Sequence, residues 1–174
     1  MSDPVKVIES VVSLDYERPL TLATRDYLDA IREKRIIGHK CPSCGTVFTP
    51  PRGYCPVCTV PTGKEQEVEL SSTGTLVSYS ILNPDALHQG QQPTVRGTVQ
   101  LDGSEVSIPG DLPDVKPDEA HPGIRLRAVF SNPSNEEAAM GAGWGGFGIT
   151  GFERTGEPDV PADQIKRLST GGAI

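Results

Sequence analysis

Residues 40–58 read KCPSCGTVFTPPRGYCPVC, and this stretch decides the fold. It holds all the cysteines of the chain, Cys41, Cys44, Cys55 and Cys58, in the spacing C-x2-C-x10-C-x2-C. Each Cys-Pro-x-Cys turn directs two thiolates at one ion, while nearby backbone N–H groups bond the sulfurs. A tetrahedral site of four sulfurs leaves no position for a substrate and contributes to folding. The spacing therefore predicts a zinc ribbon with a structural zinc ion.

Two alternatives use the same four cysteines. Iron accepts the same ligands in a rubredoxin-type site, and a degenerate ribbon holds no metal. A redox Cys-x-x-Cys motif needs a βαβ context, which the flanking sequence lacks. The second turn has Thr59 where glycine would adopt the turn most easily, so it is the less ideal of the two.

The segment before the ribbon has a helical period. From about Leu20 to Ile37, apolar residues recur at spacings of three and four, with charged residues on the other side. Thr21 or Thr24 can cap the start, and Gly38 ends the predicted helix. Residues 1–19 show no sustained period and are expected to form an irregular lead-in.

The segment after the ribbon has a period of two, which is typical of strands. Asp102-Gly103 is a tight hairpin signal, because both residues tolerate a positive φ. We predict a mainly β protein in which an N-terminal helix and a zinc ribbon precede a five-stranded OB-fold barrel. The predicted strands are 67–70, 75–82, 94–101, 105–108 and 124–130.

These patterns divide the chain into four parts. We expect a lead-in and helix over 1–38, a zinc ribbon over 39–62, an OB-fold domain over 63–154 and a flexible tail over 155–174. Trp144 and Phe147 stand in the glycine-rich stretch GAGWGGFGITGF of residues 141–152. They are interpreted either as anchors for a partner protein or as part of a closing barrel strand with a glycine bulge.

Charge and composition exclude several classes of function. The 174-residue chain has no apolar run of the roughly 20 residues that a membrane span needs, and its acidic, polar start is unlike a secretory signal, so we expect a soluble cytoplasmic protein. The net charge is −7, yet residues 32–52 carry +4 and the rest −11. A general nucleic-acid surface would need positive charge spread more widely. The basic island consists of Arg32, Lys34, Arg35, Lys40 and Arg52.

The order of these parts resembles one known family. The carrying stretches are REKRIIGHK (32–40), the ribbon CPSCGTVFTPPRGYCPVC (41–58), GTLVSYSIL (74–82), VQLDGSEVSIPGDLPDV (99–115) and GIRLRAVF (123–130). Together they resemble the DUF35 family, OB-fold proteins with a rubredoxin-like zinc ribbon that are associated with acyl-CoA. The resemblance covers about residues 20 to 130.

The resemblance implies a non-catalytic accessory subunit that binds acyl-CoA and assembles with a thiolase-like or lipid-transfer-protein-like enzyme, as a heterotetramer. In related steroid side-chain systems such a pair is a retro-aldolase acting on CoA thioesters, and in others it carries out thiolysis or condensation. The basic island is the only concentrated positive charge able to meet the phosphates of CoA. The alternative is an OB-fold module that binds nucleic acid or protein, which the 5% aromatic content disfavours.

No catalytic constellation stands out in the sequence. The cysteines are assigned to the metal, and His39, His88 and His121 have no nucleophile or acid partner at an interpretable spacing. His39, close to Cys41, is a candidate to support the metal site or to contact a phosphate. We therefore expect the isolated chain to catalyse no reaction on acyl-CoA.

Overall fold

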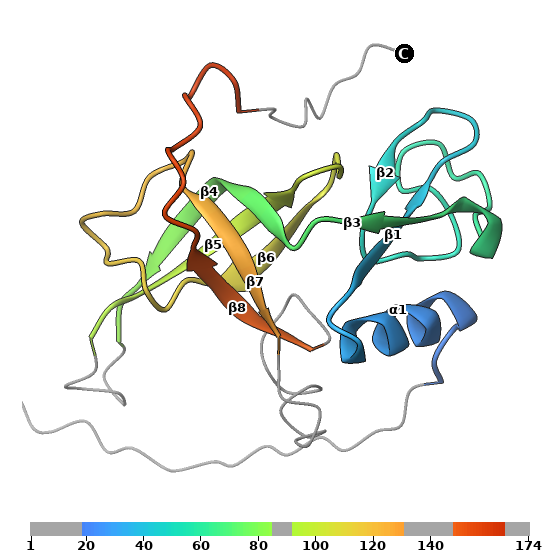
Figure 1. The fold of residues 1–174 in the computed structure, drawn as a ribbon, viewed down its shortest axis with the longest axis horizontal. Coiled ribbons are helices and arrows are strands. Elements are labelled where there is room, and N and C mark those ends of the chain that lie inside the picture. The colour runs from blue at the N-terminus through green and yellow to red at the C-terminus, as the bar shows by residue number, and fades with distance from the viewer. Residues whose placement is uncertain (1–18, 85–91, 131–147, 166–174) are drawn as a thin grey trace, which may run out of the picture.

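The chain folds into a helix, a small three-stranded sheet and a larger five-stranded sheet (Figure 1). The computed structural model describes residues 19–84, 92–130 and 148–165. None of the helices in these ranges has the length and apolar character needed to cross a bilayer. The architecture is mainly β, as the sequence predicts.

Helix α1 spans Leu22–Arg32 and packs one face against the small sheet. The Thr21 side chain accepts a hydrogen bond from the Thr24 N–H at 3.2 Å, so Thr21 is the N-cap. Tyr27, Ala30 and Ile31 are the buried positions, at the spacing of one helical face. The helix then ends at Glu33, where Lys34 takes a left-handed φ of 59°.

The helix is shorter than the sequence period suggests, because its expected last residues form a strand. Strand β1 covers Ile36–Lys40 and lies between β2 (Val47–Phe48) and β3 (Glu67–Leu70). A strand paired on both sides and covered by a helix has consecutive buried residues, and β1 is buried from Ile36 to His39. Its apolar pair therefore looked helical in the sequence. Gly38 lies inside β1, where an added Cβ would meet the Phe48 carbonyl oxygen at 2.7 Å.

The five-stranded sheet has the order β6-β5-β4-β7-β8. Its strands are β4 (Thr73–Leu82), β5 (Thr94–Leu101), β6 (Ser107–Asp111), β7 (Arg125–Phe130) and β8 (Ile149–Arg154). The Asp102-Gly103 turn joins β5 to β6, with Gly103 at a φ of 92°. Two assignments from the sequence were wrong: residues 67–70 pair with β1 in the small sheet, and the fifth barrel strand is β8. One of the two interpretations of residues 141–152, a closing barrel strand, agrees with β8, whereas the alternating residues 67–70 were counted as a barrel strand in its place.

The two edge strands of the larger sheet meet and close a barrel. An added Cβ on Gly110 of β6 would lie 2.5 Å from the Phe152 ring of β8, and one on Gly151 would lie 2.7 Å from the Asp111 carbonyl oxygen. Only glycine permits so close an approach of the Phe152 ring at residue 110 and of the neighbouring backbone at residue 151. The strand order and this closure are those of the five-stranded OB-fold.

The ribbon and the barrel are joined by a shared hydrophobic core and by a pair of hydrogen bonds between Val47 and Glu105. One hydrophobic core runs from Tyr27 and Ile37 through Leu70 to the barrel interior around Leu126 and Phe152. At the outer edge of β2, the Val47 N–H donates to the Glu105 carboxylate at 2.5 Å, and the Glu105 N–H donates to the Val47 carbonyl at 2.9 Å. The β5–β6 hairpin therefore caps an edge strand that would otherwise be open.

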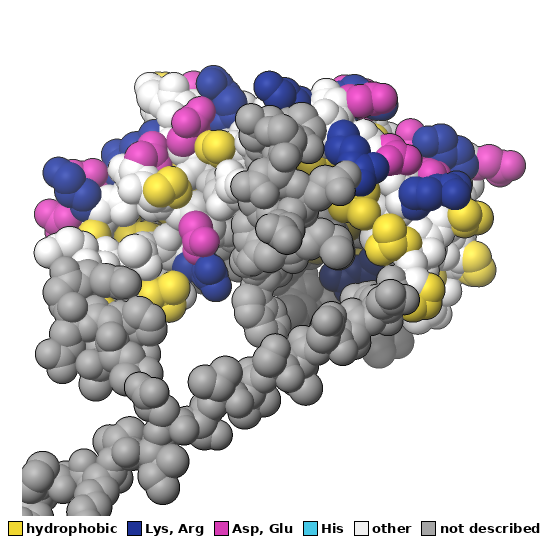
Figure 2. All heavy atoms as spheres, turned by 90° about the horizontal axis from the view of Figure 1, so that it is seen from below, with side chains coloured by type: hydrophobic (Ala, Val, Ile, Leu, Met, Phe, Trp, Pro, Cys, Tyr) yellow, Lys and Arg dark blue, Asp and Glu magenta, His cyan; other side chains and the backbone are white. Residues whose placement is uncertain are grey.

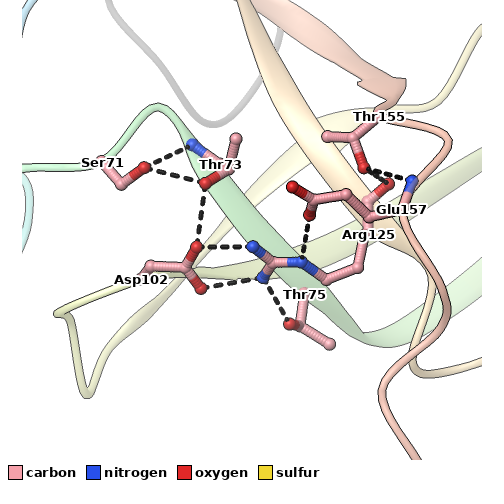
Figure 3. A network of polar contacts seen from close by, with 7 residues as sticks. All are labelled: Ser71, Thr73, Thr75, Asp102, Arg125, Thr155 and Glu157. Carbon is pink, nitrogen blue, oxygen red and sulfur yellow. Dashed lines mark hydrogen bonds and ion pairs between the residues drawn. The ribbon is translucent and has the colours of Figure 1, made fainter.

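Residues 155–165 follow β8 and lie against the barrel, although the sequence suggested a flexible tail. Arg125 connects this segment to the barrel (Figure 3): its Nε donates to Glu157 at 3.0 Å, and its two terminal nitrogens bond the two Asp102 oxygens at 2.8 and 2.6 Å. The Val160 N–H donates to the Gly123 carbonyl at 2.9 Å. The contact of residues 155–165 with the barrel could not be predicted from their composition, because their partners lie more than 20 residues away in the sequence.

Candidate functional site

The four cysteines come together at the end of the small sheet. Their sulfurs all lie within 4.8 Å of one another, with Cys41–Cys58 at 3.4 Å, Cys44–Cys55 at 3.6 Å and Cys44–Cys58 at 3.7 Å. A tetrahedral ion with metal–sulfur bonds of about 2.3 Å needs sulfurs about 3.8 Å apart. The donor set and its spacing therefore fit structural zinc, with Cys41, Cys44, Cys55 and Cys58 as the ligands.

The two cysteine turns have the same backbone geometry. The Gly45 N–H bonds the Cys41 carbonyl at 3.0 Å, and the Thr59 N–H bonds the Cys55 carbonyl at the same distance. Gly45 has a φ of 76° and Thr59 a φ of 60°, so the threonine takes the left-handed conformation that glycine takes in the first turn. Such a residue is strained by about 1 kcal/mol or more. The closed metal site holds this turn in place.

Hydrogen bonds to the sulfurs of Cys41 and Cys44 favour the thiolate form of these two ligands. The N–H groups of Ser43 and Cys44 point at the Cys41 sulfur at 3.4 and 3.5 Å, and the Val57 N–H points at the Cys55 sulfur at 3.4 Å. The Thr46 side chain, with its hydroxyl 3.2 Å from the Cys44 sulfur, and the Thr46 backbone lower the pKa of Cys44 to about 6. A low thiol pKa favours metal binding at neutral pH.

His39 supports the ribbon from inside. Its side chain is buried, its Nδ1 lies 3.0 Å from the Thr62 hydroxyl, and its ring meets the Phe48 ring edge-on at a centroid distance of 6.1 Å. Burial lowers the pKa of His39 below its ordinary value. A buried, neutral imidazole is unsuited to contact a phosphate, so of the two roles considered for His39 the structure favours support of the ribbon.

The structure separates the basic island into two groups at opposite ends of β1. Arg32, Lys34 and Arg35 surround the end of α1, whereas Lys40 lies about 17 Å further along, at about 3.3 Å per strand residue. Arg32 pairs with Asp29 at 2.8 Å, and Arg35 pairs with Glu33 at 2.7 Å and Glu69 at 3.3 Å.

Three cations of the island have no carboxylate partner among the described residues: Lys34, Lys40 and Arg52. Lys40 lines an open depression beside the first cysteine turn, together with Glu65 and Glu67. Figure 2 shows basic and acidic side chains intermixed over the visible described surface, not a continuous basic face. The positions of Trp144 and Phe147 lie outside the described residues.

Comparison with known proteins identifies both parts of the chain. A family model described as the rubredoxin-like zinc ribbon domain of ChsH2 matches residues 28–61, and one described as the C-terminal OB-fold domain of ChsH2 matches residues 67–131. A DUF35 domain-containing scaffold protein from Methanothermobacter thermautotrophicus is 31% identical over 119 residues, which cover 67% of this chain and 87% of the relative. This chain belongs to the DUF35 family.

Other DUF35 proteins agree with this assignment. The DUF35 domain-containing scaffold protein of Methanocaldococcus jannaschii is 35% identical over 97 residues, covering 55% of this chain and 67% of the relative. The crystal structure of a DUF35 protein of unknown function from Sulfolobus solfataricus superposes with a TM-score of 0.52 at 22% identity, covering 62% of this chain and 78% of the other. That likeness shows a shared fold.

Two residues that organise the DUF35 fold here were missed in the sequence. Glu105 joins the ribbon to the barrel, and Arg125 joins the C-terminal segment to the barrel. Neither belongs to a motif. A charged residue in an alternating strand pattern ordinarily faces solvent. The structure shows instead that the Arg125 side chain is only 15% exposed.

Proposed function

We propose that this DUF35 protein is a non-catalytic accessory subunit that assembles with a thiolase-like enzyme acting on CoA thioesters. The observation that carries the proposal is the membership of a family whose curated relatives are scaffold proteins. A scaffold organises another subunit, and the reaction, whether retro-aldol cleavage or thiolysis, is the chemistry of that subunit.

The site geometry supports this role. All four cysteines converge on one metal position, so none of them is left over as a nucleophile. Of the two histidines in the described part of the chain, His39 is buried against Thr62, and His121 is bonded to Asp159 and to the Glu119 carbonyl. These contacts hold the fold together.

The unpaired cations are the proposed contacts for the nucleotide end of CoA. Phosphate groups bind to lysine and arginine that are free of carboxylate partners. Within the basic island, Lys34, Lys40 and Arg52 meet this condition among the described residues, whereas Arg32 and Arg35 are held by acidic side chains. Nucleic-acid binding is disfavoured, because the barrel arginines Arg96 and Arg125 are likewise bonded to carboxylates.

Co-expression with the thiolase-like protein encoded nearest to this chain tests the proposal. We expect the two to co-purify and to elute together in size exclusion as a complex of two chains of each, because thiolase-like enzymes are dimers. We expect turnover of a CoA thioester by the complex and none by this chain alone. Separate elution of the two proteins at micromolar concentration contradicts the proposal, and so does turnover by this chain alone.

A further inference from the structure

The outer half of β4 forms an arm that is paired on one side only. Residues Ser78–Leu82 pair with β5, from Ser78 opposite Thr98 to Leu82 opposite Thr94. On the other side, β7 pairs with β4 only over Thr73–Thr75. The last backbone bonds on that side join Leu76 to Ile124 and Gly123. From residue 77 to residue 82, the described part of the chain provides no partner for this edge.

The arm exposes apolar side chains on both faces. Tyr79 is 39% exposed, Ile81 41% and Leu82 43%, although β4 is buried at Gly74 and Leu76. Tyr79 and Ile81 share a face with their β5 neighbours Gly97 and Val95, and Leu82 lies on the opposite face with Thr94. Exposed apolar strand edges favour pairing with another chain.

The arm lacks the charged residues and the proline that often protect a free edge. Residues 77–82 read VSYSIL and contain no lysine, other charged residue or proline. The nearest cation on the neighbouring strand, Arg96, is bonded to Asp111 at 2.6 Å. This edge has free backbone groups and only neutral side chains. It can therefore form main-chain hydrogen bonds with an extended, uncharged segment, and it does not repel an apolar segment.

Four segments of this chain lie outside the description: residues 1–18, 85–91, 131–147 and 166–174. Residues 131–147 leave from the end of β7, where Ala128 bonds Ser72, and Figure 1 shows this end away from the end of β4. Residues 85–91 connect the arm to β5 within seven residues and include one large apolar side chain, Leu87. Residues 166–174 start beside Thr75 and the 101–105 hairpin, and the test therefore includes a variant that lacks them.

We infer that the free edge of β4, residues 77–82, is the docking site for an uncharged extended strand of the thiolase-like enzyme subunit. The inference rests on the proposed function and specifies its interface. Strand addition gives main-chain hydrogen bonds to the edge, while Tyr79, Ile81 and Leu82 supply the apolar contacts. Aromatic and aliphatic anchors of this kind carry much of the binding energy at interfaces.

The test compares two pairs of exposed apolar residues. The arm variant is Tyr79→Ser with Ile81→Lys, and the control is Tyr54→Ser with Val57→Lys on the ribbon, where the native side chains are 52% and 65% exposed. We expect the arm variant to weaken binding to the co-expressed thiolase-like protein by about tenfold or more. The control is expected to change binding less than about threefold. Circular dichroism and melting temperature check that both variants fold.

Hydrogen exchange gives the second measurement. On complex formation, the amides of residues 77–82 are expected to become protected, because an added strand bonds the free edge. Wild-type binding that is unchanged in the arm variant overturns the inference and leaves the proposed function standing. Absence of wild-type binding contradicts both.

Two further outcomes assign the arm to another occupant and overturn the inference. One is a homodimer of the isolated protein that the arm variant disrupts, which assigns the edge to a second copy of the chain. The other is protection of residues 77–82 in the isolated monomer, which assigns the edge to residues of this chain outside the described ranges; loss of that protection after truncation at Ile165 assigns it to the C-terminal residues.

Discussion

At the scale of single residues, the cysteine turns were predictable and the charged contacts were not. Cys41, Cys44, Cys55 and Cys58 follow a spacing that geometry links directly to one metal ion. Thr59 seemed a departure from that pattern, yet its φ of 60° reproduces the glycine conformation of the first turn. The basic island was contiguous in sequence, but β1 separates its members in space. Local spacing therefore predicts turns well and surfaces poorly.

Loss of one ligand should release the metal and loosen the ribbon end first, and it should lower the stability of the barrel without unfolding it. Cys41, Phe48 and Cys55 form a small cluster separate from the main core. We expect Cys44→Ser to reduce bound zinc from about one equivalent to below about half of one. The strand signal in far-UV circular dichroism should remain, because the main core that holds the barrel strands is separate from the cysteine cluster. Metal analysis of freshly purified protein measures the first effect, and unchanged zinc content contradicts the ligand assignment.

Arg125 should matter more to stability than its neighbour Arg127. Arg125 bonds Asp102 through two nitrogens and also contacts Glu157, and it holds the pKa of Asp102 below its ordinary value. We expect Arg125→Met to lower the free energy of unfolding by about 2 kcal/mol. Arg127, exposed on the same strand with no ion pair among the described residues, is the control, and Arg127→Met should change it by about 0.5 kcal/mol or less. Urea unfolding measures both variants, and equal losses of unfolding free energy would contradict this prediction.

The unpaired lysines should contribute most to binding of a CoA ester. We expect Lys34→Glu with Lys40→Glu to weaken CoA-ester affinity by about tenfold, since each exposed charge contact is worth about 0.5 to 1 kcal/mol and each reversal also adds repulsion. The effect should shrink as salt rises. Lys116→Glu on the barrel, where Lys116 lies 3.5 Å from Glu119, is the control for the general field. Calorimetry on the assembled complex at two salt concentrations measures the difference, and equal losses contradict a local site.

At the scale of elements, periodicity identified most strands but could not say which sheet each joins. The prediction of strands at 94–101 and 124–130 agrees closely with β5 and β7. The pair Ile36-Ile37 was read as helix, because a doubly paired strand loses its alternation. Residues 67–70 were correctly a strand, yet they belong to the ribbon sheet. Pairing depends on contacts between distant segments, which a single sequence does not record.

The segment after β8 should be held by a contact that depends on pH. His121 Nε2 lies 2.7 Å from Asp159, and this hydrogen bond raises the pKa of His121 above its ordinary value of 6.5. Because the folded pKa is raised, the contribution is fully present below pH 6.5 and is lost as pH rises through the folded value. Glu119, whose carbonyl accepts from Nδ1, and Arg154 also face this ring.

Removal of the carboxylate charge tests this contact. We expect Asp159→Asn to lower the His121 pKa toward 6.5 in an NMR titration. We also expect residues 155–160 to exchange amide hydrogens faster than in the wild-type protein at pH 6, with a smaller difference at pH 8. An unchanged His121 titration in the variant contradicts the assignment.

At the scale of the whole molecule, ribbon and barrel should not unfold independently. Glu105 bonds both backbone groups of Val47, and Val106 packs against the metal-end cluster. We expect the destabilisation by Cys44→Ser to reach the barrel in the wild-type background and to be smaller after Glu105→Ala. A double-mutant cycle on the unfolding free energy should give a coupling of about 0.5 kcal/mol or more. A coupling near zero would mean that the Glu105–Val47 hydrogen bonds do not link the stability of the ribbon to that of the barrel.

The irregularity in β4 between Leu76 and Ser78 determines which side chains the outer half of the strand turns inward. Opposite β5, Leu76 faces Val99, but the next matched pair is Ser78 with Thr98, so residue 77 is an extra residue in the strand. It reverses the parity of the strand: even-numbered residues point inward before it and odd-numbered residues after it. A chain one residue shorter there would keep this phase only by losing the bulge. A straight pairing of the present sequence would turn the serines inward and Tyr79 outward. The bulge, and not the length of the strand alone, therefore sets which side chains a docked strand meets, so relatives have to be compared at this position for gaps as well as for substitutions.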